Sequence, residues 1–190
     1  MIPEFGVTAW GRAWLRLAEP TAVTTVDARL PKARALARRD RVEYLATAPG
    51  RIDAVVRAKD AKHSIQLAFP LWDDAARERA DAFLDENPAA WQALSGGDAP
   101  DELAATVGDV APDTDDIEAT CRCRERRRPC LHQLAVLYAL VQRIDEEPAL
   151  ALALRGWVRA AAADDGPGPV PLAALDPAGF YIWRAALADE

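Results

Sequence analysis

All three cysteines of this 190-residue chain, and one of its two histidines, lie within twelve residues, 121–132. Core packing gives cysteines no reason to gather in one short segment. Thiolate sulfur and imidazole nitrogen are preferred zinc ligands, and three sulfurs with one nitrogen complete a closed tetrahedral site. The sequence therefore predicts one structural Zn²⁺ ion with four ligands: Cys121, Cys123, Cys130 and His132.

The spacing of these ligands predicts how the chain folds around the metal. Cys121 and Cys123 are separated by one residue, so in an extended strand both sulfurs point the same way. Residues 124–129 then form a loop, and Cys130 and His132 bracket the start of a long helix, whose N-terminus favours a thiolate. Zinc would thus join the end of a strand to the start of a helix. Three thiolates against Zn²⁺ leave one negative charge, which nearby arginines could offset by donating to the sulfurs.

Other uses of the cluster fit the residues less well. A catalytic zinc keeps an open water position, which four protein ligands would fill. A nucleophilic Cys130–His132 pair would leave Cys121 and Cys123 without a role, and a disulfide between those two would be strained. The chain has no Ser/His/Asp set, phosphate-binding glycine loop or HExxH helix. We therefore predict no catalytic residues and no enzyme activity.

Two arginine-rich segments are candidates for contact with a ligand or partner. The guanidinium fork matches phosphates and carboxylates with two parallel hydrogen bonds. Salt bridges within the protein, for instance to the eight acids of residues 98–118, are the alternative, and a solvated helix face is the alternative for residues 29–41. Both interpretations stay open for the candidate contact residues, which are Arg122, Arg124, Arg126, Arg127, Arg128, Arg34, Arg38, Arg39 and Arg41.

Charge and composition narrow the class of protein. The formal net charge is -7, with 12 Lys/Arg against 7 Asp/Glu in residues 1–62 and 11 against 23 in the rest. This uneven distribution of charge along the chain favours docking in one orientation over non-specific coating of a polyanion such as nucleic acid. The sequence has no apolar run long enough to span a membrane and no signal peptide at its start, and its odd cysteine count argues against a disulfide framework. We expect a cytoplasmic protein with reduced thiols.

Hydrophobic periodicity predicts an α+β fold, with a small antiparallel sheet packed against helices. Residues 42–57 alternate around Pro49-Gly50 as a β-hairpin, residues 63–69 form a third strand and residues 117–120 a last one. Helical patterns occupy residues 8–17, 73–85, 88–95, 101–106, 133–144 and 148–155. Gly11 inside the first helix would allow close approach of another element. His63 is expected to be an ordinary strand or turn residue.

The predicted domain organisation follows from composition. Residues 1–97 form an N-terminal α/β region, 98–116 an acidic connector, and 117–159 the finger with its helices, and residues 1–159 are expected to make one compact domain. Residues 160–169, rich in Ala, Asp, Gly and Pro, predict a linker. Residues 170–190 form a C-terminal extension whose docking place the sequence leaves open.

The pattern Cys-x-Cys-x6-Cys-x-His resembles the SWIM zinc finger family, whose motif is CxC, a variable gap and CxH. The helix after His132 resembles that of bacterial members, and so does the front of the chain, with Trp10-Gly11 and Trp14, so the resemblance spans residues 5–157. The chain departs from these relatives in a connector without glycine at residues 32–37 and in the arginine-rich finger loop.

The resemblance implies DNA-binding or protein–protein interaction, and its bacterial members are commonly linked with Swi/Snf-type helicase-like ATPases. We therefore expect a non-enzymatic zinc-binding interaction module that acts with such an ATPase, or another DNA-transaction protein, in a DNA transaction. Direct nucleic-acid binding through the finger arginines and residues 34–41 is the alternative.

Overall fold

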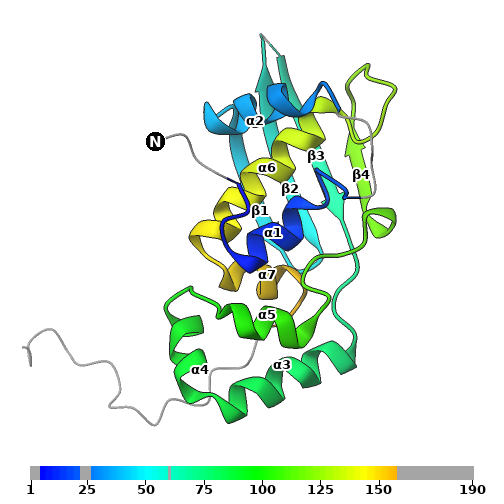
Figure 1. Ribbon diagram of the computed structural model, residues 1–190. Coiled ribbons are helices and arrows are strands. Elements are labelled where there is room, and N and C mark those ends of the chain that lie inside the picture. The colour runs from blue at the N-terminus through cyan, green and yellow to red at the C-terminus, as the bar shows by residue number, and fades with distance from the viewer. Residues whose placement is uncertain (1–4, 22–26, 60, 158–190) are drawn as a thin grey trace, which may run out of the picture. The chain divides into compact units, whose positions relative to one another are not determined.

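A four-stranded antiparallel sheet, with neighbours in the order β1-β2-β3-β4, carries the first zinc ligand at one edge (Figure 1). The structure is a computed structural model that describes residues 5–21, 27–59 and 61–157. These residues belong to one compact unit that runs to Val158. The predicted linker at 160–169 and the extension at 170–190 lie outside the described residues, and the proposed domain boundaries stay a prediction.

Three strands follow one another directly: β1 (Val42–Ala48), β2 (Arg51–Ala58) and β3 (Ala61–Ala68). Side chains of a strand alternate between its faces, and Ile52, Ala54 and Val56 on one face of β2 are all buried. Gly50 closes the β1–β2 turn with φ +68°, and a Cβ there would lie 2.9 Å from the carbonyl oxygen of Phe69. The hairpin forms as the alternation and the Pro-Gly turn predict.

Helix α6 (Leu131–Glu146) crosses the buried face of the sheet and contacts all four strands (Figure 1). Ten of its sixteen residues are buried, because α1 (Ala9–Leu15) and α2 (Leu30–Arg38) pack against its other sides. A helix that is apolar nearly all round belongs in the centre of a domain. The zinc ligands at its N-terminus are therefore attached to the core of the fold.

Three α-helices and a short 3-10 helix form an insertion between β3 and β4. They are α3 (Asp74–Glu86), α4 (Pro88–Ser95), α5 (Asp101–Val107) and the short 3-10 helix η1 (Thr114–Asp116). The chain then returns to the sheet as β4 (Glu118–Cys121), where Cys121 pairs with Ile65 of β3. After α6, helix α7 (Ala149–Leu154) ends the described fold.

The predicted α+β class is confirmed, including the zinc finger that joins a strand to the long helix. Thr8 and Asp73 cap α1 and α3 as their positions suggest, with side chains accepting from the N–H groups of Gly11 and Ala76. Strand β3 begins two residues earlier than expected, at Ala61, and β4 ends at Cys121 rather than before it. Pairing with the neighbouring strand, which periodicity does not reveal, determines the start of β3 and the end of β4. None of the described helices is long and apolar enough to cross a membrane.

Candidate metal centre

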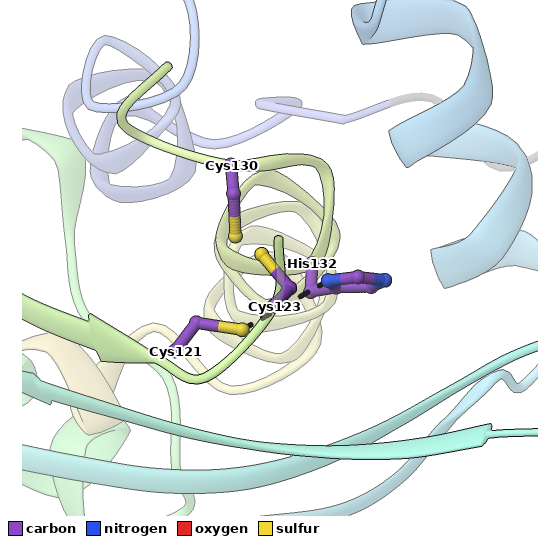
Figure 2. Close-up of side chains that lie close together, drawn as sticks. All are labelled: Cys121, Cys123, Cys130 and His132. Carbon is purple, nitrogen blue, oxygen red and sulfur yellow. Dashed lines mark hydrogen bonds between the residues drawn. The ribbon is translucent and has the colours of Figure 1, made fainter. Parts of the chain in front are cut away.

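The four predicted ligands lie close together, and Figure 2 shows the three sulfurs pointing toward one another with the His132 ring beside them. Cys121 comes from the end of β4, Cys123 from the loop that follows, and Cys130 and His132 from the start of α6. One donor atom of each residue lies within 4.8 Å of all the others, and Cys121 Sγ is 3.9 Å from His132 Nδ1. Around a tetrahedral Zn²⁺ with ordinary bond lengths, a sulfur and a nitrogen are about 3.6 Å apart. The donor set and its spacing therefore fit one structural zinc ion.

Cys130 is fully buried at the N-cap of α6. Its backbone N–H donates to Oε1 of Gln133, 2.7 Å away, and the Gln133 N–H points at the Cys130 side chain, which completes a capping box. Burial raises the pKa of the Cys130 thiol, and backbone N–H groups of Gln133 and His132 oppose that rise. The helix start thus presents donors to a thiolate sulfur, as the sequence predicts.

The other two thiols sit in contrasting surroundings. Burial raises the pKa of the Cys121 thiol to about 12. Burial acts in the same direction on Cys123, but the Glu125 N–H and the Arg128 guanidinium together lower the pKa of Cys123 below its usual value. Zinc binds thiolates and releases their protons, so a bound zinc ion would supply the positive charge that a thiolate at the half-buried Cys121 requires.

Arg128 confirms the expectation that an arginine of the loop donates to a ligand sulfur. Its Nη1 lies 3.6 Å from Cys123 Sγ and 3.0 Å from the carbonyl oxygen of Glu125, and Nη2 lies 3.2 Å from the carbonyl oxygen of Cys121. The Arg128 guanidinium therefore contacts both cysteines of the Cys121-Arg122-Cys123 segment. It offsets the negative charge of the sulfurs and holds the loop closed.

Arg29, at the N-terminus of α2, holds the loop from the other side. It forms a salt bridge with Asp27, donates to Glu125 Oε1 at 2.9 Å and to the carbonyl oxygen of Pro129 at 2.7 Å. Glu125 Oε2 in turn accepts from the N–H of Leu131, 2.8 Å away, in the first turn of α6. This chain of contacts fixes the loop between α2 and α6. Sequence reasoning missed Arg29, Asp27 and Glu125, because the contacts of Arg29 with Glu125 and Pro129 join residues 96 and 100 positions apart.

His63 lies beside the metal centre, which the sequence analysis did not expect. Its ring stacks on that of His132 with centroids 3.8 Å apart and planes 18° from parallel. A signal for this placement existed: His63, Ile65 and Leu67 alternate along β3 and share a face. Because Ile65 pairs with Cys121, the residue two positions before it lies next to the finger. His63 therefore fixes the ring orientation of a zinc ligand.

The candidate contact arginines divide into two groups. Arg34 is held inside the fold by Glu19 and the Tyr138 hydroxyl, and Arg38 lies over the Phe5 ring with its guanidinium carbon 5.3 Å from the centroid. Arg127 lies 3.8 Å from Asp27, and Arg128 contacts the finger. The side chains without an ion pair to any described residue, all exposed, are Arg122, Arg124, Arg126, Arg39 and Arg41. No loop arginine pairs with an acid of residues 98–118 in the described part of the chain.

The family model of the SWIM zinc finger matches residues 106–141. This chain contains a SWIM zinc finger. The match covers β4, the finger loop and the first two-thirds of α6, so the resemblance of the front of the chain stays a prediction. No curated protein and no solved structure matches the chain. The SWIM finger is a zinc-binding module, and its four ligands are those that Figure 2 draws together.

Proposed function

We propose that this protein is a non-enzymatic interaction module that docks onto a helicase-like ATPase of the Swi/Snf type, or another DNA-transaction protein. The proposal rests on one observation: in the finger, one set of residues is placed to bind zinc and another set is exposed to solvent. Four protein ligands fill the tetrahedral zinc site, and three loop arginines, Arg122, Arg124 and Arg126, project outward without an ion pair to any described residue. The metal holds a binding surface in place.

The loop is built for recognition because its shape is fixed before binding. Arg29 and Arg128 tie its backbone to α2 and to the strand end, so little backbone entropy is lost when a partner binds the loop. Arginine is enriched at protein interfaces, where its planar guanidinium pairs with carboxylates. The net charge of -7 repels a long polyanion such as nucleic acid. A protein partner that presents only a few acidic groups to the exposed arginines is therefore favoured.

Affinity purification of the tagged chain from its native host tests the proposal. The wild type is compared with a triple variant, Arg122→Glu, Arg124→Glu and Arg126→Glu, and with a control that has the same number of charge reversals on other surfaces, Arg16→Glu, Arg51→Glu and Arg77→Glu. Each protein is first shown to hold one zinc ion. We expect the wild type and the control to enrich an ATPase that the triple variant loses. If no DNA-transaction protein is enriched, or if the triple variant enriches it equally, the proposal is wrong.

Direct nucleic-acid binding is a second candidate, favoured by the exposed cations Arg39 and Arg41 in addition to those of the finger. The engagement of Arg34 with Glu19 reduces the surface on which this candidate relies. Binding to phosphates releases counterions, so the affinity for an oligonucleotide would fall steeply with salt. A mobility-shift titration with an oligonucleotide at two salt concentrations tests this second candidate. If binding is absent, or does not depend on salt, direct nucleic-acid binding is ruled out.

A further inference from the structure

A groove of about 690 Å³ lies between α2, the turn end of the β2–β3 hairpin and the first residues of α6. Its floor is aliphatic: Ala35 and Leu36 come from α2, Ala58 and Ala61 from the hairpin, and Leu131 from α6. Clefts of this size accommodate several apolar side chains of a ligand. No aromatic ring other than the two stacked imidazoles, His63 and His132, lines its described part.

Four cations surround this floor: Lys32 on α2, Arg39 at its C-cap, Arg41 two residues further on, and Lys59 in the hairpin turn. All four side chains are exposed, and none forms an ion pair with a described residue. None of the described lining residues is acidic. The groove therefore combines an apolar floor with a positive rim that forms no ion pair with a described residue, although the chain as a whole carries a net charge of -7.

The two faces of α2 explain how this surface arises. Ala33 and Ala37 are buried, and α2 packs against α6. Lys32, Leu36 and Arg39 recur at i, i+4 and i+7 and therefore share the face that lines the groove. The fold uses one face of α2 for its own core and leaves the other, with both apolar and cationic side chains, toward solvent.

We propose that this groove docks an acidic amphipathic helix of the partner protein. A helix with leucine-like residues on one face would place them on the aliphatic floor, and flanking carboxylates would reach the four cations. A phosphate backbone has no apolar face to fill the floor, and bases would find few rings on which to stack. The inference rests on the proposed role as a protein interaction module, and it concerns a surface separate from the exposed arginines of the finger.

Fluorescence anisotropy with the zinc-loaded full chain tests the inference. The probe is a labelled fourteen-residue peptide with leucines on one helical face and glutamates elsewhere. A peptide of the same composition, with the leucines shuffled so that no face forms, and a single-stranded DNA of fourteen nucleotides are the comparison probes. We expect the amphipathic peptide to bind about tenfold more tightly than the shuffled one, a difference of about 1.4 kcal/mol, and to lose affinity as salt screens the rim.

Two variants separate the rim from the floor. Arg39→Glu with Arg41→Glu should weaken peptide binding about tenfold, whereas the control Arg51→Glu with Arg77→Glu should leave it unchanged. Leu36→Ala should weaken it several-fold, with Val7→Ala as a control at another exposed apolar residue. Zinc content and circular dichroism confirm that each variant is folded. Equal binding of both peptides, preference for the DNA, or indifference to the Arg39 and Arg41 reversals would overturn the inference.

A photo-crosslinker identifies the natural occupant. Benzoylphenylalanine in place of Ala61, an exposed lining residue, is expected to capture a partner segment in which acids flank apolar residues at helical spacing. A crosslink to nucleic acid, to a segment without acids or to a second copy of this chain would contradict the proposal. The two proposals can fail separately. If an ATPase is enriched but the peptide does not bind, only the proposed role of the groove is wrong. If the peptide binds but no ATPase is enriched, only the proposed ATPase partner is wrong.

Discussion

Gly11 provides a sharp test of how the front of the chain is attached to α6. A Cβ at this position would lie 2.0 Å from Oδ1 and 2.6 Å from Cγ of Asp145, near the C-terminal end of α6. Asp145 accepts three hydrogen bonds, from the N–H of Gly6 at 2.7 Å and from the N–H and hydroxyl of Thr8 at 2.9 Å each. In Gly11→Ala the carboxylate must rotate away to make room, and these bonds are lost.

The expected magnitude follows from two opposing effects. Glycine to alanine inside a helix by itself stabilises by about 1 kcal/mol. Three hydrogen bonds to a charged acceptor, at about 1.5 kcal/mol each for this half-buried site, contribute about 4.5 kcal/mol. We therefore expect Gly11→Ala to lower the free energy of unfolding by about 3–4 kcal/mol, a sign opposite to that of helix propensity.

A double-mutant cycle measured by urea denaturation checks this reasoning. In an Asp145→Ala background the obstructing carboxylate is gone, so adding Gly11→Ala should raise the free energy of unfolding by about 1 kcal/mol. All four proteins are compared at the same zinc occupancy. If Gly11→Ala stabilises the wild type, or changes stability equally in both backgrounds, the steric account is wrong.

Three further predictions concern the finger. Cys130→Ser should lower zinc affinity by orders of magnitude, seen in competition with a chromogenic chelator, and unchanged affinity would contradict the ligand assignment. Arg29→Ala removes the contacts to Glu125 and should cost about tenfold or more in zinc affinity, whereas a loss no greater than that of the distant Arg51→Ala would refute this bracing role. His63→Ala should lower zinc affinity several-fold by freeing the ligand ring, and His63→Phe, which preserves the stacking surface, should restore most of it.

The parts of this fold that local chemistry determines could be predicted from the sequence. Alternation and a Pro-Gly turn predicted the hairpin, and the ligand spacing predicted the strand-to-helix zinc site. What could not be predicted depends on pairs of residues far apart in the chain, such as Arg29 with Glu125 and His63 with His132. Alternation places His63 on the same face of β3 as Ile65, but only the pairing of Ile65 with Cys121, which the sequence does not reveal, brings it to His132. The basic segment is the clearest case, because the half-buried Arg34 pairs with Glu19 whereas Arg39 and Arg41 are exposed.

The topology indicates what the zinc ion stabilises. Strand β4 has four residues and pairs with β3 alone, whereas α6 is buried against the sheet and two helices. The large apolar core does not include the finger loop, which is held by Arg29, Arg128 and the metal. Loss of zinc should therefore release the loop and β4 before the core. Hydrogen exchange after chelation would then show lost protection at residues 118–130 with β2 still protected, whereas unfolding of the whole domain would contradict this view. Metal binding thus controls the surface that the finger presents.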